Sequence, residues 1–492
     1  MKRKNAWLAW ALSIGLIAYM LGAALPSRSK VDQVPGITAR ASGVAIHADA
    51  IQAGATGPRV VDAEIAFAAA NVNSDGFGAT SAQNEMQVNV QPQAIPFVGT
   101  KASGRGGALE LGLGSDVPTN ADTLAQTVSE AVAPPNSPIV IKDAGPLPIN
   151  PLAYVSLLHS EALANFGENP CVSASNSPIA YGRGYAADAQ LIDTSASTTS
   201  GPLTNPVIAT DDPNPARAVS QSASFVYAIP NSNTTGGQHY GLVSETHTTF
   251  APVTILRMAP APALIIEVLG EWVFKTTATG IPDNPATAGV NEAGKVEYYV
   301  LDDVTKAPVT PSTAVIRFST TGGLLYTSLT FQQVFGGTGL VVPLPPLLDL
   351  AIGEDPRALA APGVAPDPNS APTINANGTG VSGAVDVVRL SVLAGVQVGF
   401  SLAQVRIGHF ESALTVPAGG FTCSLPPTSP PTTATTTTTI PTSTTSSTTT
   451  TTGPTTTAGP TTTLKPTTTT STTTPPPSPI PRPIVVQPNT VG

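Results

Sequence analysis

Residues 60–67 read Val-Val-Asp-Ala-Glu-Ile-Ala-Phe and alternate between apolar and polar side chains. Successive side chains of a β-strand point to opposite faces, so this alternation predicts a strand with one buried face. The turn-forming sequence Asn-Ser-Asp-Gly follows at residues 73–76, and a second alternating stretch, Glu-Met-Gln-Val-Asn-Val, occupies residues 85–90. We therefore predict a β-hairpin here.

The same short-period pattern continues along the chain between Gly, Pro and Asn turns. It predicts further strands at residues 225–229, 263–274, 296–301, 314–318, 385–393 and 396–407. Short strands separated by turn residues are typical of antiparallel sandwiches. We expect an all-β fold, built from antiparallel β-sandwich domains with one short connecting helix and a disordered C-terminal tail.

The helix is expected at residues 121–132, because Thr119 and Asn120 can cap it and Leu124, Val128, Ala131 and Val132 share one face. The sequence Pro-Pro-Asn-Ser-Pro follows at residues 134–138 and predicts a break. We accordingly place a small β-domain at residues 31–118, a helix and Pro-rich connector at 119–150, and a main β-sandwich domain at 151–423.

Both ends of the chain point to export. Lys2, Arg3 and Lys4 precede an uncharged, mostly apolar run at residues 6–25. This run fits a signal peptide, and it is also long enough for an uncleaved N-terminal membrane anchor, so residues 1–25 have either role. Residues 424–481 consist mainly of Thr and Pro, the composition of a disordered, O-glycosylated stalk, and residues 482–492 form a tail. We expect a secreted or cell-surface protein.

The composition restricts the partners of the chain. Charged residues make up 11% of it and the net charge is −9. With no basic stripe to neutralise phosphates, a nucleic-acid partner is not expected. Cell-envelope components or an extracellular polysaccharide remain candidate partners. Contact with a membrane is expected only through the leader, if the leader stays uncleaved.

The chain contains two cysteines, Cys171 and Cys423. In an exported protein an even pair of cysteines indicates a disulfide, which would close the main domain just before the Thr/Pro tract. Two free thiols or a metal-binding pair are the alternatives, and no further cysteine supports the latter.

The common catalytic and cofactor motifs are missing from the sequence. The stretch Gly-Arg-Gly-Tyr-Ala-Ala at residues 182–187 only superficially resembles a dinucleotide fingerprint, and we interpret it as a turn into a strand. Oxygen-bearing side chains alternate at Asn71, Asn73 and Asp75 as in a calcium loop. The distal glutamate of such a loop is missing, and a hairpin turn explains the pattern. No cofactor is expected.

One regularity concerns the histidines. Four of the five have an acidic residue two positions away, and the pairs are His47/Asp49, His159/Glu161, Glu245/His247 and His409/Glu411. Residues i and i+2 of a strand share a face, so each pair could be a structural ion pair. If the strands around residues 159, 245 and 409 were neighbours, the six side chains could instead hold a divalent metal. The metal hypothesis requires at least three of them to converge.

Aromatic residues are sparse after the leader. Trp272 follows an apolar stretch and is expected in the core. Tyr298, Tyr299 and Tyr326 are the remaining candidates for a glycan-binding platform.

Several segments also resemble a group of secreted actinobacterial surface proteins, similar in style to the "choice-of-anchor" proteins. The segments lie at residues 151–162, Cys171 with 180–182, 267–272, 352–357, 406–411 and 416–423. The resemblance covers residues 151–423 and implies export and a surface role, without an activity assigned to any residue. Sortase-attached relatives end in a Leu-Pro-x-Thr-Gly-like motif, an apolar helix and basic residues. Residues 487–492, Gln-Pro-Asn-Thr-Val-Gly, carry none of these, so sortase attachment is not expected.

Together these features predict a non-enzymatic, exported protein with a structural or adhesive role in the cell envelope. A secreted metal-binding protein or metal-dependent hydrolase using the His/Glu pairs is one alternative. A polysaccharide-binding module is the other.

Overall fold

A computed structural model describes most of the chain between residues 36 and 422. The described residues are 36–49, 61–77, 99–113, 128–149, 153–166, 178–193, 201–210, 219–255, 264–282, 294–320, 325–335, 348–354, 373–392 and 403–422. They belong to one compact unit, residues 1–426. The predicted leader (1–25), stalk (424–481) and tail (482–492) lie outside them.

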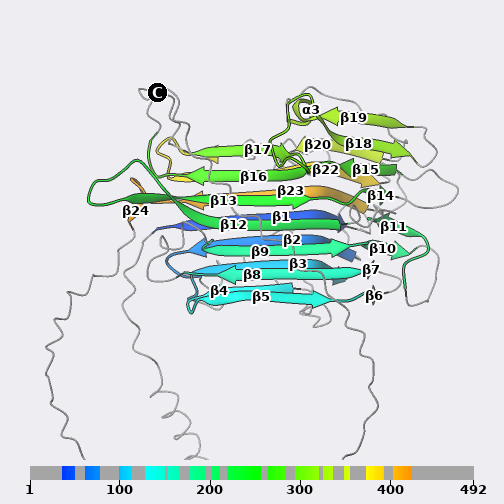
Figure 1. Cartoon of the computed structure of the whole chain (residues 1–492), viewed down its shortest axis with the longest axis horizontal. Helices are drawn as coiled ribbons and strands as arrows, with labels where there is room; N and C mark the ends of the chain where they lie inside the picture. Colours follow the sequence, from blue (N-terminus) through cyan, green and yellow to red (C-terminus); the bar gives the residue numbers. More distant parts are fainter. Residues whose placement is uncertain are drawn as a thin grey trace, which may run out of the picture. The chain divides into compact units, whose positions relative to one another are not determined.

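The described part of the chain is all-β, with antiparallel strands stacked in a sandwich, as the sequence predicts (Figure 1). Sheet 1 has the order β20-β22-β23-β1-β2-β3-β4, with β21 beside β22. Its strands are β20 (Leu348–Glu354), β21 (Thr373–Ile374), β22 (Gly380–Val392), β23 (Ala403–Thr415), β1 (Thr38–Asp49), β2 (Val61–Asn73), β3 (Ala102–Leu113) and β4 (Val128–Ala133).

Sheets 2 and 3 form the opposite layer. Sheet 2 contains, in spatial order, β17 (Lys295–Leu301), β16 (Glu271–Ala278), β13 (His239–Thr249), β12 (Val219–Pro230), β9 (Ala180–Ala187), β8 (Leu157–Ala164) and β5 (Ser137–Ala144), with β24 (Phe421–Thr422) beside β13. Sheet 3 contains β19 (Tyr326–Thr330), β18 (Ala314–Thr320), β15 (Leu264–Val268), β14 (Val253–Ile255), β11 (Pro206–Ala209), β10 (Gln190–Asp193), β7 (Ala153–Val155) and β6 (Leu147–Ile149).

Sheets 2 and 3 together behave as one layer of seven long strands, each broken once. The order 17-16-13-12-9-8-5 in sheet 2 matches the order 18-15-14-11-10-7-6 in sheet 3, and each matched pair is consecutive in sequence. The shortest break is the single residue Ser156, between β7 and β8. Asp188 lies in the break between β9 and β10 and has a positive φ of 48°. In Figure 1 the strands of sheet 2 continue at their right-hand ends into those of sheet 3.

Sheet 1 bends as well. At Ala45 of β1 the regular pairing is interrupted on both sides. Ala45 is paired neither with Gly408 of β23 nor with Ala66 of β2, the residues that lie opposite it. Gly408 and Ala66 have positive φ values of 70° and 54°. Such irregularities bend a strand locally. The isoleucines next to these three residues, Ile46, Ile65 and Ile407, belong to a large apolar core shared with sheet 3.

Sheets 1 and 2 approach each other so closely that side chains larger than Ser or Thr are excluded at their centre. A Cβ added to Gly104 would lie 2.0 Å from the Tyr181 carbonyl oxygen, and one added to Gly182 would lie 2.0 Å from the Arg105 carbonyl oxygen. Glycine is used in strands where another backbone approaches this closely. The sequence Gly-Arg-Gly at residues 182–184 is therefore part of strand β9 and serves sheet packing.

Hydroxyl groups fill the rest of this contact. The Ser224 hydroxyl donates to the Ala68 carbonyl across the two sheets at 3.2 Å. The hydroxyls of Ser129 and Ser160 lie 2.8 Å apart, also across the sheets. Ser412 meets the hydroxyls of Ser244 and Thr276. Because these buried hydroxyls find partners, the contact carries polar groups without a large penalty.

The helix expected at residues 121–132 is wrong over its described part, because residues 128–133 form strand β4. Ser129, Ala131 and Ala133 present small buried side chains toward sheet 2, whereas Glu130 on the opposite face binds Arg105. Tertiary pairing with β3 overrides the local helical pattern. The only helix in the described residues is α3 (Phe331–Phe335).

Strands from the predicted small domain and the predicted main domain share a sheet. β1 pairs with β23 over nearly its whole length, from Thr38↔Thr415 to Asp49↔Gln404. The connector predicted at 119–150 contains the edge strands β4, β5 and β6 and does not separate two sets of sheets. In the predicted hairpin β2 is confirmed, but its described partners are β1 and β3, and residues 85–90 lie outside the described part.

Candidate functional site

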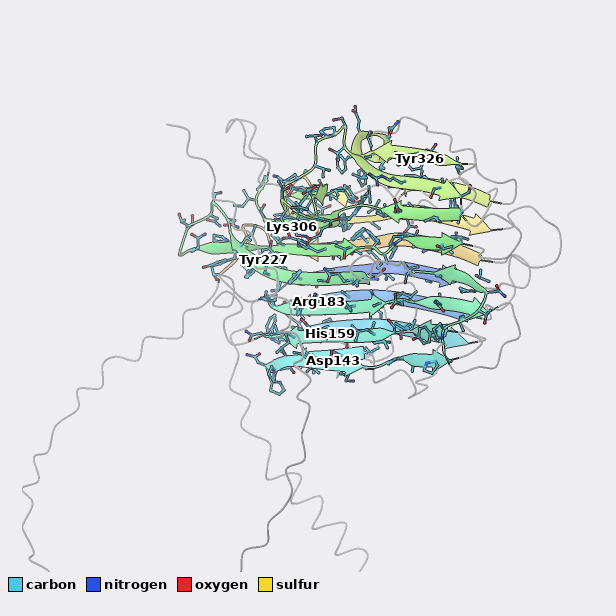
Figure 2. All side chains as sticks on the ribbon, turned by 45° about the vertical axis from the view of Figure 1, so that its right-hand side comes forward. Asp143, His159, Arg183, Tyr227, Lys306 and Tyr326 are labelled. Atoms are coloured by element: carbon cyan, nitrogen blue, oxygen red, sulfur yellow. The ribbon has the colours of Figure 1, made fainter. Side chains whose placement is uncertain are left out.

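The charged side chains of sheet 2 gather on its outer face, opposite the Gly- and Ser-rich contact with sheet 1. Figure 2 shows Asp143, His159, Arg183, Tyr227 and Lys306 following one another across the strands. We call the whole set the ionic belt; it comprises Asp143, His159, Glu161, Tyr181, Arg183, Tyr227, Glu245, His247, Glu271, Lys275 and Lys306.

The first half of the belt is centred on His159 of β8. Its Nδ1 lies 2.6 Å from Asp143 Oδ1 on β5, and its Nε2 lies 2.8 Å from Glu161 Oε1. The second oxygen of Glu161 accepts a hydrogen bond of 2.7 Å from the Tyr181 hydroxyl on β9. Arg183 Nη1 reaches Glu161 Oε1 at 3.3 Å. The sequence-predicted pair His159/Glu161 is therefore formed.

The second half is centred on His247 of β13. Its Nε2 lies 2.9 Å from Glu245 Oε1, and its Nδ1 lies 2.6 Å from Glu271 Oε1 on β16. The Tyr227 hydroxyl donates to Glu245 Oε2 at 2.7 Å. Lys306 Nζ lies 3.1 Å from Glu271 Oε2. The two halves thus repeat one arrangement, a histidine clamped by two carboxylates, one of which also accepts from a tyrosine.

This geometry fixes the charge of each imidazole. An ionised carboxylate only accepts hydrogen bonds, so a ring with a carboxylate at each nitrogen must donate from both and carry a positive charge. Burial disfavours the charged form of His247, but the hydrogen bonds to Glu245 and Glu271 outweigh it and raise its pKa to about 9. The hydrogen bond to Glu161 likewise raises the pKa of His159, against the opposing effect of burial.

The carboxylates respond in the opposite sense. Burial alone would raise the pKa of Glu245, yet the hydrogen bond and charge of His247 prevail and lower the pKa to about 2. The same balance lowers the pKa of Glu271 to about 2, with help from Lys306. Near neutral pH His247, Glu245 and Glu271 are therefore ionised partners within one hydrogen-bonded group.

The third predicted pair is not formed as expected. His409 is 2% exposed on β23, and its Nδ1 lies 2.7 Å from Asp386 Oδ1 on β22. Glu411 instead accepts from Arg40 Nη2 at 3.0 Å. His47 is buried with Glu64 directly opposite it on β2, and the side chain of Asp49 lies outside the described residues.

The six predicted metal ligands do not converge. His159 and His247 stand on strands β8 and β13, which are separated by β9 and β12, so the strand spacing puts them about 14 Å apart. His409 and Glu411 belong to sheet 1. Within the described residues no group of three His, Cys, Asp or Glu side chains is placed to hold a metal ion. The predicted shared coordination shell is wrong, because the His/Glu pairs have the same sequence spacing but lie on strands that are not neighbours.

The other sequence-predicted residues have clear positions. Trp272 is 2% exposed, which confirms its place in the core, and its Nε1 donates to the Leu269 carbonyl at 3.0 Å. Asn73 Oδ1 accepts from the Asp75 amide in a turn. The second strand of the predicted hairpin, residues 85–90, lies outside the described residues, so the hairpin itself stays a prediction. Among the glycan-platform candidates, Tyr298 stacks on Phe274 and on Phe335, whereas Tyr326 is 70% exposed on β19.

The predicted disulfide partners Cys171 and Cys423 both lie outside the described residues. Phe166 and Phe421 are described residues that precede Cys171 and Cys423 in the sequence. Phe166 and Phe421 are both buried members of one apolar cluster, 4% and 2% exposed. The disulfide stays a prediction.

Sequence reasoning missed Asp143, Tyr181, Tyr227 and Glu271, although all four are directly bound to the predicted His/Glu pairs. Each lies on the same face of its strand as the predicted pairs, so the alternation of the sequence indicated which way its side chain points. Which strand lies beside which was not readable, because that depends on the long-range pairings β5–β8 and β13–β16.

Comparison with known proteins adds no relative. No family model, curated protein or solved structure matches the chain. Among the described residues, no helix combines the length and the apolar character needed to cross a membrane.

Proposed function

We propose that this chain is a non-enzymatic, exported component of the cell envelope or extracellular space with a structural or adhesive role. The N-terminal basic and apolar run and the Thr/Pro tract support export, and the low charge content is common in extracellular proteins. The resemblance of residues 151–423 to secreted surface proteins agrees with this proposal.

The observation that carries the structural role is the contact between sheets 1 and 2. Backbones meet directly at Gly104, Gly106, Gly182 and Gly184, and inter-sheet hydroxyls such as Ser129 and Ser224 are hydrogen-bonded. Stacked sheets of this kind are close-packed and resist deformation. The ionic belt adds cross-strand pairs over the outer face of sheet 2. Both features favour a stiff body suited to a mechanical or adhesive task.

Localisation is tested first. Cells that produce the full chain with an epitope tag after Gly492 are separated into medium, envelope, membrane and cytoplasm, and intact cells are treated with a protease. We expect the chain in the medium or envelope, with its folded part resistant to the protease and its Thr/Pro tract sensitive to it. Recovery from the cytoplasm alone would contradict export.

The structural role is tested separately on purified full-length protein. Metal content by inductively coupled plasma mass spectrometry is expected to be below one ion per chain, with unfolding unchanged by a chelator. A stoichiometric metal ion, lost on His247→Gln, would contradict the proposal and favour the metal-dependent alternative. Adhesion is measured as retention of protein-coated beads on envelope preparations, and retention no higher than that of uncoated beads would remove the adhesive part.

A further inference from the structure

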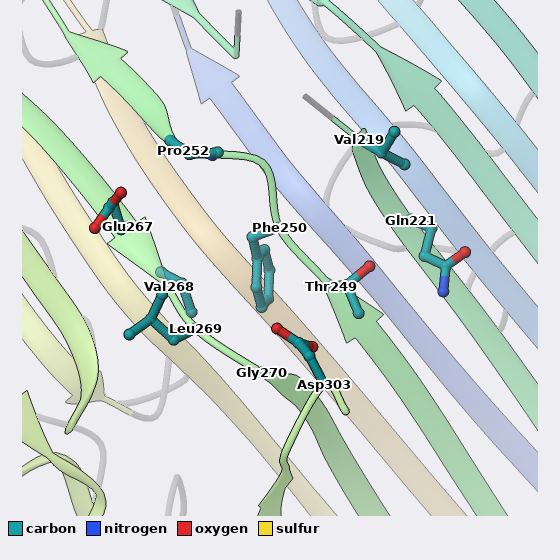
Figure 3. Close-up of a pocket in the computed structure, with 10 residues that line it drawn as sticks. All are labelled: Val219, Gln221, Thr249, Phe250, Pro252, Glu267, Val268, Leu269, Gly270 and Asp303. Carbon is teal, nitrogen blue, oxygen red and sulfur yellow. The ribbon is translucent and has the colours of Figure 1, made fainter. Parts of the chain in front are cut away.

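A pocket of about 330 Å³ opens on the outer face of the second layer, where sheet 2 meets sheet 3 (Figure 3). Strand β13 ends at Thr249, and β14 begins only at Val253, so the strand leaves the sheet between its neighbours β12 and β16. Phe250, Ala251 and Pro252 form this break. The pocket occupies the gap that results.

The base of the pocket is apolar and the turn beside it is fixed. Phe250 is 9% exposed and lies at the centre of the lining residues (Figure 3). Gly270 has a φ of +82°, and a Cβ at this residue would lie 2.5 Å from Val300 Cγ1. Only glycine fits this turn without strain. The apolar walls are Val219, Pro252, Val268 and Leu269.

The charges of the pocket are negative, whereas its neutral polar groups include donors: Gln221 Oε1 accepts from Arg183 Nη2 at 2.9 Å, and the Gln221 amide group and the Thr249 hydroxyl can donate. Of the ten lining residues, Glu267 and Asp303 are acidic and none is basic. No other described residue makes a hydrogen bond or ion pair with the Asp303 carboxylate, and the Thr249 hydroxyl is likewise unpaired in the described part of the chain. Arg317 Nη1 approaches Glu267 Oε2 at 3.8 Å, so Asp303 is the less compensated of the two carboxylates.

The charged residues of the neighbouring ionic belt are paired with one another. Glu245 and Glu271 pair with His247, Lys275 and Lys306 rather than with the lining of the pocket. A ligand in the pocket therefore meets an aromatic ring, aliphatic walls and two carboxylates, with no basic residue among the lining residues. Such surroundings suit a cation, since an ammonium group has only donors and is attracted both to carboxylates and to the face of a ring.

We propose that this pocket binds a small organic ammonium ion, whose apolar body packs on Phe250 and Leu269 and whose ammonium group pairs with Asp303 and Thr249. Pockets that bind small molecules combine a mostly apolar lining with a few polar groups that set orientation. This proposal does not rest on the proposed structural or adhesive role, because it depends only on the lining of the pocket.

The test uses the purified full chain and three probes of nearly equal shape. These are cyclohexylammonium, neutral cyclohexanol and anionic cyclohexanecarboxylate, titrated by calorimetry and followed at the backbone amide of Gly270 by NMR. We expect saturable binding of the cation, with weaker binding of the alcohol and none of the carboxylate. Binding of cyclohexylammonium should weaken as salt is raised.

Two variants separate the proposed contact from a general effect of charge. Asp303→Asn should weaken binding of the cation about tenfold, the size of effect expected on loss of one charge-assisted hydrogen bond, and should leave binding of cyclohexanol unchanged. Glu297→Gln removes an exposed carboxylate that is paired with Lys295 away from the pocket, and should leave all three titrations unchanged. Thermal unfolding of each variant checks that it is folded.

Either of two results would overturn the proposal. Binding of cyclohexanol as tight as that of cyclohexylammonium would show an apolar pocket without preference for a cation. The absence of any saturable change at Gly270 with the cation, in protein whose unfolding is normal, would show that the pocket is not a site for this class of ligand.

Discussion

His247 provides the most quantitative test of the structure. In the folded chain its ring is held between Glu245 and Glu271 at 2.9 Å and 2.6 Å, with a pKa of about 9 against an ordinary value of 6.5. A folded-state pKa above the unfolded value means that the folded chain retains a proton which the unfolded chain has lost. The free energy of unfolding must therefore fall as the pH rises from about 6.5 to about 9.

The size of the effect follows from the shift. Each pH unit in this window removes about 1.4 kcal/mol, so the whole window removes about 3 kcal/mol. The lowered pKa values of Glu245 and Glu271 describe the same contacts from the acidic side, and they should not be added to this figure. Their contribution is complete above about pH 4.5 and is lost as the pH falls toward 2. The clamp is therefore fully effective between about pH 4.5 and 6.5.

The assay is urea unfolding between pH 5 and 10 on the wild type and on His247→Gln, whose amide group can donate hydrogen bonds but does not titrate. The difference in the free energy of unfolding should be constant up to about pH 6.5 and should then shrink by about 1.4 kcal/mol per pH unit. His239→Gln is the control, because that ring contacts Asn233 and the Thr235 carbonyl and, within the described part of the chain, no carboxylate. A difference between wild type and His247→Gln that stays flat from pH 6.5 to 9 would refute the clamp.

Three further predictions address packing, the tyrosine contact and the cysteines. Gly182→Ala places a Cβ 2.0 Å from the Arg105 carbonyl oxygen and should lower the free energy of unfolding in urea by about 3 kcal/mol or more, the upper end for overpacking. Gly145→Ala, whose added Cβ meets no described atom within 4 Å, should change it by about 0.5 kcal/mol or less. Equal effects of the two variants would contradict the close approach of the sheets. Tyr227→Phe removes a donor to the Glu245 carboxylate and should lower the midpoint of thermal unfolding at pH 6, through a loss of about 2 kcal/mol; an unchanged midpoint would show that this hydrogen bond is not formed. If Cys171 and Cys423 are bonded, peptide mapping without reductant should recover them in one linked peptide, and two separately alkylated cysteines would exclude the bond.

Much of the fold was readable from local sequence. The alternation at residues 60–67 and its equivalents predicted strands β2, β12, β17 and β18. The burial of Trp272 was equally predictable, since side-chain direction and hydrophobicity are local properties. The error at residues 128–132 shows the limit of this reasoning: the spacing of Val128, Ala131 and Val132 also fits a helix, and only the pairing with β3 selects the strand.

The same distinction between local pattern and long-range pairing applies to the candidate site. Composition and spacing alone determined that the chain is rich in β-strands and that acidic residues accompany its histidines. They predicted a turn into a strand at residues 182–187, and the structure places these residues within strand β9. Only the tertiary structure decided that His159 and His247 are each clamped by a second carboxylate, Asp143 or Glu271, from a neighbouring strand. It also decided that the His/Glu pairs stand apart and that the glycines admit an opposing backbone. The physical reason is that face and period are fixed by each strand itself, whereas the neighbour of a strand is chosen by contacts between residues far apart in the chain.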